Sequence, residues 1–322
     1  MANQTEMLNK AANGPAPIKS KIKRTISLSL REKRIRSLAY WFILPAMLFF
    51  ILMNAYPLVT VLWDSFQFKN LMNKAISGFA GLNNFKEVIN NEYFRSSLRN
   101  TAVWTVLSVA GEFVLGLISA IALNQKVRGR LVFRSIIIIP WVVPIVIAGL
   151  TWTWMLTPDY GIINLWLTKL GIIDEPYYWL GELNTALLTV VFVNIWRSFP
   201  FYTISLLAGL QSISRDMLEA AAIDGAGIRM RFFRIVLPQL KTVSLTIIFI
   251  HVIWTAINFD FIWVMTEGGP LHASETLPIM IYNYAMKSYN FGNASALASM
   301  MLVFMISGFI LYYFATIRKS RG

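Results

Sequence analysis

The sequence predicts an all-α, polytopic membrane protein with six transmembrane helices. Hydrophobic residues make up 56% of the 322-residue chain and charged residues only 14%, which is too apolar for a soluble domain of this size. The apolar residues lie in long runs rather than at the periods of amphipathic helices or strands. Lysine and arginine gather in alternate loops between these runs, as expected for a chain that crosses a membrane repeatedly.

Six apolar runs are long enough to cross a hydrocarbon core about 30 Å thick, because an α-helix rises about 1.5 Å per residue. In chain order the expected spans are Leu38–Val61, Thr101–Leu123, Ser135–Leu156, Leu187–Leu210, Val243–Met265 and Ala296–Phe314. The first, third and sixth contain no Asp, Glu, Lys, Arg or His. The other three carry Glu112, Arg197, and His251 with Asp260.

The placement of basic residues predicts the orientation of the spans. Of the 29 lysines and arginines, 21 lie before span one, between spans two and three, between spans four and five, and after span six. The alternate loops hold 7. Because cytoplasmic loops carry the excess of Lys and Arg, both termini are expected in the cytoplasm. Topology and attraction to anionic lipid account for the net charge of +13, so no nucleic acid partner is expected.

The chain is therefore predicted to have three parts. Residues 1–37 form a basic cytoplasmic tail, residues 38–316 a six-helix membrane domain with a cytoplasmic loop at 211–241, and residues 317–322 a second cytoplasmic tail. The basic tail and the apolar run behind it are both too long for a signal peptide, so the first span is expected to be retained. The absence of cysteine excludes disulfides and cysteine metal sites.

No pattern in the sequence indicates an enzyme. The chain has no G-x-x-x-x-G-K-[ST] loop to hold nucleotide phosphates, and its two histidines, His251 and His272, do not form a set of metal ligands. No cofactor and no metal are expected in this chain. Any energy source must therefore come from elsewhere. Two broad choices remain: a secondary transporter powered by an ion gradient, or a permease subunit driven by a separate ATPase.

The cytoplasmic loop contains a charged segment, Glu219–Pro238, with strong local signals. Asp216 is predicted to cap a short helix, with Glu219 three residues later, and Gly225 to end that helix in a left-handed conformation. Residues 228–236 are predicted to form a second short helix with one apolar face. Pro238 suits the first turn of the next span.

The spacing in this segment resembles a known signature. Glu-Ala-Ala, three residues, Gly, nine residues and Ile-x-Leu-Pro is similar to the signature loop of the membrane subunits of binding-protein-dependent ABC importers. The residues concerned are Glu219, Ala220, Ala221, Asp224, Gly225, Ile235, Leu237 and Pro238. The resemblance implies a coupling helix that docks on a separate ATPase, with Glu219 paired to a basic group, the alanines permitting close approach and Gly225 making the corner. ATP and Mg²⁺ would then be bound by the ATPase.

Further motifs resemble the carbohydrate-uptake branch of these importers, over about residues 36–320. They are Gly81 to Phe85, Asn100-Thr101, Trp141, Pro144, Phe259-Asp260, Thr266 to Pro270, and Tyr282. The resemblance implies a prokaryotic plasma (inner) membrane protein of the type I permease fold. Its partners would be a second homologous permease, two ATPase subunits, an extracytoplasmic solute-binding protein, the lipid bilayer and a sugar substrate. The loop at 157–182 is too short to hold an inserted domain.

Ionisable residues within the spans are candidates for the substrate path, because they are costly in lipid and usually face a cavity or a partner. Glu112 and Arg197 are predicted to lie about 16 and 15 Å from the outer ends of their spans and to pair. The alternative is that Arg197 snorkels or contacts backbone carbonyls. His251, Trp254 and Asn258 share one helical face, which suits either a sugar ring or a helix contact.

Other path residues are weaker candidates. Asp260 is expected near the outer boundary, at a gate or in contact with substrate. Asn194, Tyr202 and Tyr284 complete the set. Three prolines are expected to kink their helices and open backbone groups to a cavity: Pro140, Pro144 and Pro200.

Together these features predict a permease subunit of an ATP-driven importer that carries a sugar or oligosaccharide inward by alternating access. Arg197 would favour an acidic sugar if it is free of Glu112, whereas a neutral sugar fits equally well if the two pair. A proton-coupled secondary transporter with Glu112, Asp260 and His251 as a relay is the alternative, but it leaves the Glu219–Pro238 pattern without a role. A membrane scaffold without transport leaves the charges within the spans unexplained.

Overall fold

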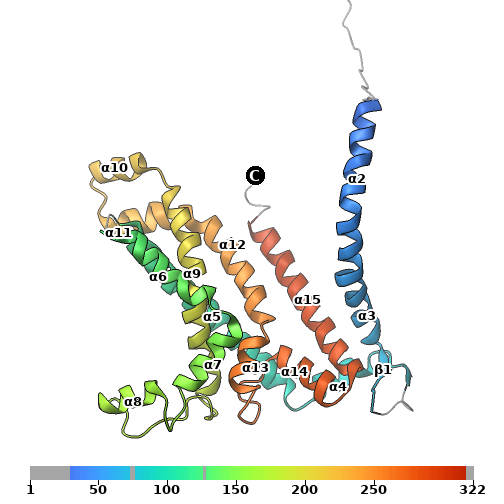
Figure 1. The fold of residues 1–322 in the computed structure, drawn as a ribbon. Helices are drawn as coiled ribbons and strands as arrows, with labels where there is room; N and C mark the ends of the chain where they lie inside the picture. The colour runs from blue at the N-terminus through green and yellow to red at the C-terminus, as the bar shows by residue number, and fades with distance from the viewer. Residues whose placement is uncertain (1–29, 73–76, 126–127, 317–322) are drawn as a thin grey trace, which may run out of the picture. The chain divides into compact units, whose positions relative to one another are not determined.

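The computed structural model describes residues 30–72, 77–125 and 128–316 (Figure 1). The chain divides into two compact units, residues 1–57 and 58–322, which are treated separately. Most of the expected N-terminal tail, and the expected C-terminal tail at 317–322, lie outside the described residues. Residues 30–37, assigned to the tail from the sequence, already belong to the first helix.

The described residues of the first unit form one helical stretch, which is apolar from Leu38 onward. It contains α2 (Leu30–Phe50), the π-helical turn η1 (Ile51–Ala55) and the first two residues of α3 (Tyr56–Asp64). The stretch Leu38–Asp64 is long and apolar enough to cross a membrane and includes the first expected span.

The second unit is helical apart from one short hairpin. Its further elements are β1 (Gln67–Lys69), β2 (Ser77–Phe79), α4 (Asn83–Asn90), α5 (Phe94–Asn124), α6 (Arg130–Val142), α7 (Ile145–Met155), α8 (Ile162–Lys169), α9 (Ala186–Gln211), α10 (Arg215–Ile223), α11 (Ile228–Arg231), η2 (Phe232–Val236), α12 (Leu237–Ala256), α13 (Asp260–Thr266), α14 (Leu277–Tyr282), η3 (Asn283–Lys287) and α15 (Phe291–Thr316). The hairpin strands are antiparallel, with Gln67 opposite Phe79. The all-α prediction missed this hairpin.

Among the described residues, five helices are long and apolar enough to cross a membrane, or six if the bent pair α6 and α7 counts as one span. α5, α9 and α15 contain the expected second, fourth and sixth spans. The expected third span is not a continuous helix, because α6 and α7 meet at 91°. The break falls at Val143 and Pro144, since proline lacks an N–H and pushes the preceding residue towards an extended conformation.

The expected fifth span also differs. It was predicted to continue to Met265, but α12 ends at Ala256 and α13 begins at Asp260. Oδ1 of Asn258 accepts a hydrogen bond from the backbone N–H of Phe261 at 3.2 Å. An asparagine side chain that satisfies a backbone N–H of the next helix competes with continued helix, which explains the interruption.

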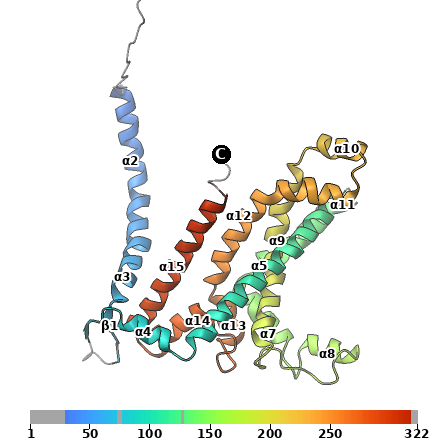
Figure 2. The same ribbon diagram turned by 180° about the vertical axis from the view of Figure 1, so that it is seen from behind.

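The centre of the second unit is the pair α5 and α9, which pack side by side (Figures 1 and 2). Gly116 on α5 permits this approach, because a Cβ there would collide with Cβ of Tyr202 and lie 3.1 Å from the backbone nitrogen of Thr203. One buried apolar cluster surrounds Trp104 and Phe261, and a second surrounds Tyr202 and Leu240.

Candidate functional site

A carboxylate is buried in the middle of α5. Glu112 has 0% of its surface exposed, and its Oε1 accepts a hydrogen bond from Nδ2 of Asn194 on α9 at 3.0 Å. Its Oε2 lies 2.9 Å from Nδ1 of His251 on α12. A carboxylate within a membrane-spanning helix is tolerated only when it is paired or hydrogen-bonded. We call Glu112, Asn194 and His251 the buried polar cluster.

Aromatic rings enclose the histidine of this cluster. The ring centroids of Tyr202, Phe201 and Trp254 lie 4.6, 4.8 and 5.4 Å from that of His251. Nε2 of His251 and the hydroxyl of Tyr202 are buried and have no hydrogen-bond partner among the described residues. His251 therefore keeps one ring nitrogen for a further hydrogen bond.

The predicted pair of Glu112 and Arg197 does not form. Within the described part of the chain, the carboxylate of Glu112 makes an ion-pair contact only with His251. Nε of Arg197 instead donates a hydrogen bond to the carbonyl oxygen of Val143 at 3.3 Å. The break at Pro144 leaves this carbonyl without its helical partner, so the arginine satisfies it; this is the backbone contact that the sequence left as the alternative.

A cavity of about 250 Å³ opens beside the buried polar cluster. Its lining residues are Trp141, Ile145, Asn194, Arg197, Ser198, His251, Trp254, Thr255 and Asn258. Five of these were predicted as path residues. Sequence reasoning missed Ser198, although it follows Asn194 by four residues and so shares its helical face.

The remaining predicted path residues do not line this cavity. Glu112 and Tyr202 are fully buried. Asp260 is exposed at the start of α13. Tyr284 packs in a third cluster between α4, α14 and α15, where burial and the charges of Glu275 and Glu87 raise the pKa of its phenol. Asp260 and Tyr284 therefore have no contact with the cavity.

The cavity combines the groups that bind hydroxylated ligands. The indole rings of Trp141 and Trp254 offer flat apolar faces, Asn194 and Asn258 offer amides, and Arg197 offers a cation. The guanidinium carbon of Arg197 also lies 6.0 Å from the centre of the Phe261 ring. These side chains suit a ligand that has apolar faces able to stack on the indole rings and many hydroxyl groups able to form hydrogen bonds.

The helix α10 forms the first half of the loop at 211–241. It begins after Ser214, so Asp216 lies in its first turn and the prediction that Asp216 caps the helix was wrong. Its end follows the prediction. Gly225 has φ +82°, its N–H bonds to the carbonyl of Ala222 at 3.1 Å, and the N–H of Ala226 bonds to the carbonyl of Ala221 at 2.9 Å. This is a Schellman ending, which favours glycine.

The second half of this loop is not a separate helix. α11, η2 and α12 form one helical stretch, Ile228–Ala256, so the prediction of an isolated helix over residues 228–236 was wrong. The π-helical turn at Phe232–Val236 admits Pro238 at the start of α12, because the wider turn relieves the hydrogen bond that proline cannot make. Figure 2 shows the stretch bending as α11 leads into α12.

The two halves present an exposed surface. Glu219, Ala220 and Asp224 are exposed, as are the apolar side chains of Ile223 and Ile228, at 87% and 80%. Met230 and Phe233 extend the apolar part. Nη1 of Arg231 lies 3.5 Å from the carbonyl oxygen of Leu218, which ties α11 to α10. We call residues 211–241 the coupling segment, after the role that the sequence motif implies for it.

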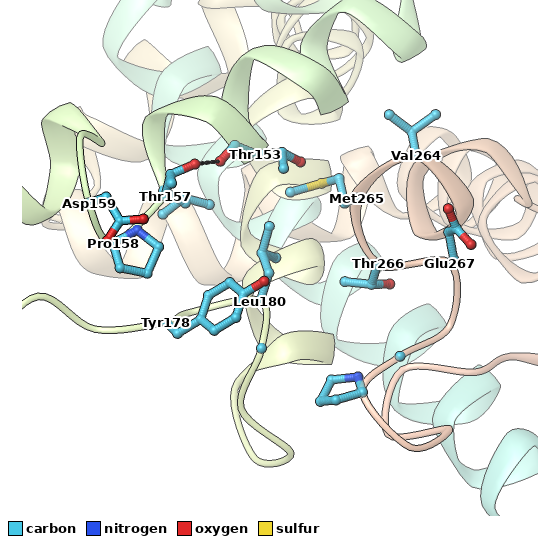
Figure 3. Close-up of a pocket in the computed structure, with 14 residues that line it drawn as sticks. Thr153, Thr157, Pro158, Asp159, Tyr178, Leu180, Val264, Met265, Thr266 and Glu267 are labelled. Carbon is cyan, nitrogen blue, oxygen red and sulfur yellow. Dashed lines mark hydrogen bonds between the residues drawn. The ribbon is translucent and has the colours of Figure 1, made fainter.

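A larger cavity, about 800 Å³ (Figure 3), lies by α7 and α13, at the end of the helices opposite α10 and α11 (Figure 1). Residues from α7 and the following loop form one wall, among them Thr153, Thr157 and Asp159, and residues from α13 and the Gly-Gly-Pro loop form the other. Sequence reasoning noted the Gly-Gly-Pro run but not this cavity, because its walls are more than 80 residues apart in the chain.

The Gly-Gly-Pro loop is held rigidly against α5. Nδ2 of Asn100 donates to the carbonyls of His272, Ala273 and Glu275, at 3.0 to 3.3 Å. The carboxylate of the buried Glu275 contacts Nδ1 of His272. Asn100 therefore joins α5 to this loop.

These features define a class of protein: a multi-pass membrane transport subunit, with a polar cavity between its helices and an exposed helical segment between two of its spans. The chain belongs to the family described as binding-protein-dependent transport system inner membrane component, whose model matches residues 112–320.

Relatives and solved structures agree with this family. The trehalose/maltose transport system permease protein MalF of Thermococcus litoralis is 35% identical over 291 residues, which cover 89% of this chain and 95% of that protein. A crystal structure of a bacterial ABC transporter that imports the acidic polysaccharide alginate matches with a TM-score of 0.76 and 20% identity, over 90% of this chain and 98% of the other. A second alginate transporter structure, in complex with a periplasmic protein bound to alginate pentasaccharide, matches with a TM-score of 0.75, 21% identity and coverage of 90% and 96%.

The family assignment confirms the resemblance to ABC importer permeases for sugars and the type I permease fold. The chain is a transport component of a binding-protein-dependent system rather than an enzyme. Membership does not favour the proton-coupled secondary transporter. The structure also separates one member of its supposed relay from the other two: Asp260 is exposed and, among the described residues, forms no ion pair or hydrogen bond with Glu112 or His251, which contact each other.

Proposed function

We propose that this chain is the membrane-spanning permease subunit of an ATP-driven importer that carries a sugar or oligosaccharide into the cytoplasm by alternating access. The observation that supports this most directly is the coupling segment. It places an acidic residue, small residues and an exposed apolar patch on one turn-linked pair of helices. A patch of this kind on a well-packed chain marks a protein contact site.

The partner at this surface is a separate ATPase that binds ATP and Mg²⁺. Glu219 would accept a charge-assisted hydrogen bond from a basic group of the ATPase, and Ile223 and Ile228 would enter an apolar cleft on it. Ile235, Leu237 and Pro238 connect this surface to α12. Because α11, η2 and α12 form one helical stretch, movement of the coupling segment would reach His251 and the cavity directly.

The substrate path runs through the cavity beside the buried polar cluster. Trp254 would stack on a sugar ring, and Asn194, Asn258 and Arg197 would bind its oxygens. Arg197 is not paired with Glu112, so the cavity accepts acidic as well as neutral sugars. The names of the similar proteins include both kinds, trehalose and maltose in one and alginate in the other.

The complete transporter would contain a second, homologous permease, two ATPase subunits and an extracytoplasmic solute-binding protein. The solute-binding protein would deliver sugar at the end with the 800 Å³ cavity, and both termini of this chain would face the cytoplasm. Six spans result if the bent pair α6 and α7 crosses the membrane as one.

Charge reversal at Glu219 tests the proposal. Glu219→Lys in the assembled transporter, reconstituted in liposomes, is expected to abolish co-purification of the ATPase and ATP-dependent sugar uptake. Glu182→Lys, an equal charge change at an exposed residue of the opposite end, is the control for association and is expected to retain the ATPase. Normal association and uptake with Glu219→Lys would contradict the coupling role. Uptake that persists without ATP and stops with an uncoupler would instead support a proton-driven carrier.

A further inference from the structure

A separate cavity of about 240 Å³ lies between α5, α6 and α9, next to the coupling segment. Most of its wall is apolar. The lining residues are Leu123, Arg134, Ile137, Ile138, Thr203, Ile204, Leu207, Ala208 and Gln211. Arg134 is the only charged residue in this wall, and neither the substrate path nor the coupling segment uses it.

The guanidinium of Arg134 lacks partners. Its Nε and Nη2 atoms are buried and have no hydrogen-bond partner among the described residues. No carboxylate of those residues forms an ion pair with it. Burying guanidinium donors without acceptors costs free energy. An anionic group that accepts hydrogen bonds from both nitrogens would remove this cost.

The surroundings indicate where that anion comes from. Arg130, the first residue of α6, lies one turn before Arg134, and Arg128 lies just before the helix; both are exposed, so this end of the helix is strongly basic. On the same helix, Leu131 and Phe133 expose apolar side chains, at 71% and 54%, as expected of a helix in contact with lipid. Basic residues at the end of an apolar helix bind the headgroup region of a membrane.

We propose that this cavity is a binding site for an anionic phospholipid. The phosphate accepts hydrogen bonds from Nε and Nη2 of Arg134 in the bidentate geometry that arginine favours. One acyl chain lies along Ile138, Ile204 and Leu207. A small soluble anion would satisfy the arginine but leave these apolar walls in contact with water, so the walls favour a lipid.

The site lies where it can influence the coupling segment. Gln211, which lines the cavity, is the last residue of α9. Only three residues separate it from the start of α10 at Arg215. A lipid in the cavity would join α6 to the end of α9. Bound anionic lipid is therefore expected to restrict movement at Gln211, where the coupling segment begins.

The test measures lipid binding to the purified transporter by native mass spectrometry, with phosphatidylglycerol as probe. Wild type is expected to retain one phosphatidylglycerol more tightly than phosphatidylcholine. Arg134→Gln is expected to weaken that binding by about fivefold or more, since an arginine near the headgroups contributes about this factor. Arg128→Gln removes the same charge outside the cavity and is expected to have a much smaller effect. Equal losses in the two variants, or none in Arg134→Gln, would overturn the proposal.

Two further arms keep the test decisive if Arg134→Gln folds poorly. Ala208→Trp leaves Arg134 in place but fills the cavity from an exposed position, and it is expected to lose the bound phosphatidylglycerol as well. Inorganic phosphate at millimolar concentration is expected not to displace the lipid. Displacement by inorganic phosphate would indicate a simple anion site. Binding of the lipid only after the ATPase has been removed from the transporter would indicate a protein contact, and either result would overturn the assignment to a phospholipid.

Discussion

His251 and Glu112 are joined across the membrane domain, with Nδ1 of the imidazole 2.9 Å from Oε2 of the carboxylate. The two residues are 139 positions apart and lie on α12 and α5. α12 continues from the coupling segment, whereas α5 packs against α9. This one contact therefore ties the helix that would move to the helices that surround the cavity.

Removing the Glu112 carboxylate is expected to destabilise the membrane domain. Glu112→Ala leaves Nδ2 of Asn194 and Nδ1 of His251 buried without their acceptor, and we expect a loss of about 3 kcal/mol in the free energy of unfolding. Glu112→Gln keeps the shape and one acceptor, so it is expected to lose less. Unfolding in mixed micelles monitored by circular dichroism measures both.

A double-mutant cycle separates this contact from the pair expected from the sequence. Glu112→Gln combined with His251→Gln is expected to be non-additive, because the two side chains touch. Glu112→Gln combined with Arg197→Gln is expected to be closer to additive, because Arg197 bonds to Val143 instead. A larger coupling energy for Glu112 and Arg197 than for Glu112 and His251 would contradict the structure.

The packing of α5 on α9 depends on the lack of a side chain at Gly116. Gly116→Ala places a Cβ against Cβ of Tyr202 and close to the backbone of α9, so we expect a loss of about 1–3 kcal/mol of stability. Gly308→Ala is the matched control, since it makes the same change within α15, where nothing lies within 4 Å of the new Cβ. There the better helix propensity of alanine is expected to leave stability equal or slightly raised. Equal effects of the two changes on the melting temperature would show that the close approach is absent.

The sequence predicts the spans and the ending of α10 because these depend on local properties. Apolar run length defines α5, α9 and α15, and Gly225 supplies the positive φ that ends α10. The predicted cap at Asp216 failed because Ser214 and Asp216 both suit a helix start, and local preference does not choose between them.

The main error at the candidate site concerns a contact between distant helices. Equal depth suggested that Glu112 and Arg197 pair, but depth does not say which way a side chain points around its helix. Asn194 and His251 contact the carboxylate of Glu112. The helix break at Pro144 leaves the carbonyl of Val143 free to accept a hydrogen bond from Arg197. By contrast, the sequence does indicate that His251, Trp254 and Asn258 share one face, because they come from one continuous stretch, and all three line the 250 Å³ cavity.

The loop between α7 and α9 is organised by one asparagine. Nδ2 of Asn164 donates to the carbonyls of Leu156, Thr157 and Tyr177, and its Oδ1 accepts from the backbone N–H of Tyr177 and from Nε1 of Trp179. Asn164→Ala is expected to loosen this loop and to make it cleavable by a protease that leaves wild type intact.

Two variants control this experiment. Asn164→Asp keeps the acceptor but loses the donor, so it is expected to be cleaved at an intermediate rate. Asn184→Ala, at an exposed residue of the same loop, is expected to resist like wild type. Cleavage of Asn164→Ala no faster than of Asn184→Ala would mean that the hydrogen bonds of Asn164 do not hold the loop.

The turn at Gly225 offers the sharpest test of the coupling segment. Gly225→Ala forces an alanine into a left-handed conformation that costs about 1–2 kcal/mol, although the space around the new Cβ is open. The change is expected to weaken binding of the ATPase by about tenfold, because the turn sets the angle between α10 and α11.

Gly227→Ala, two residues later, has equally open space but an ordinary negative φ, and it is expected to bind nearly as well as wild type. Gly225→Asn is expected to fall between them, since asparagine tolerates the left-handed region better than alanine. Binding to immobilised ATPase measures all three, and equal affinities for Gly225→Ala and Gly227→Ala would refute a role for the turn geometry.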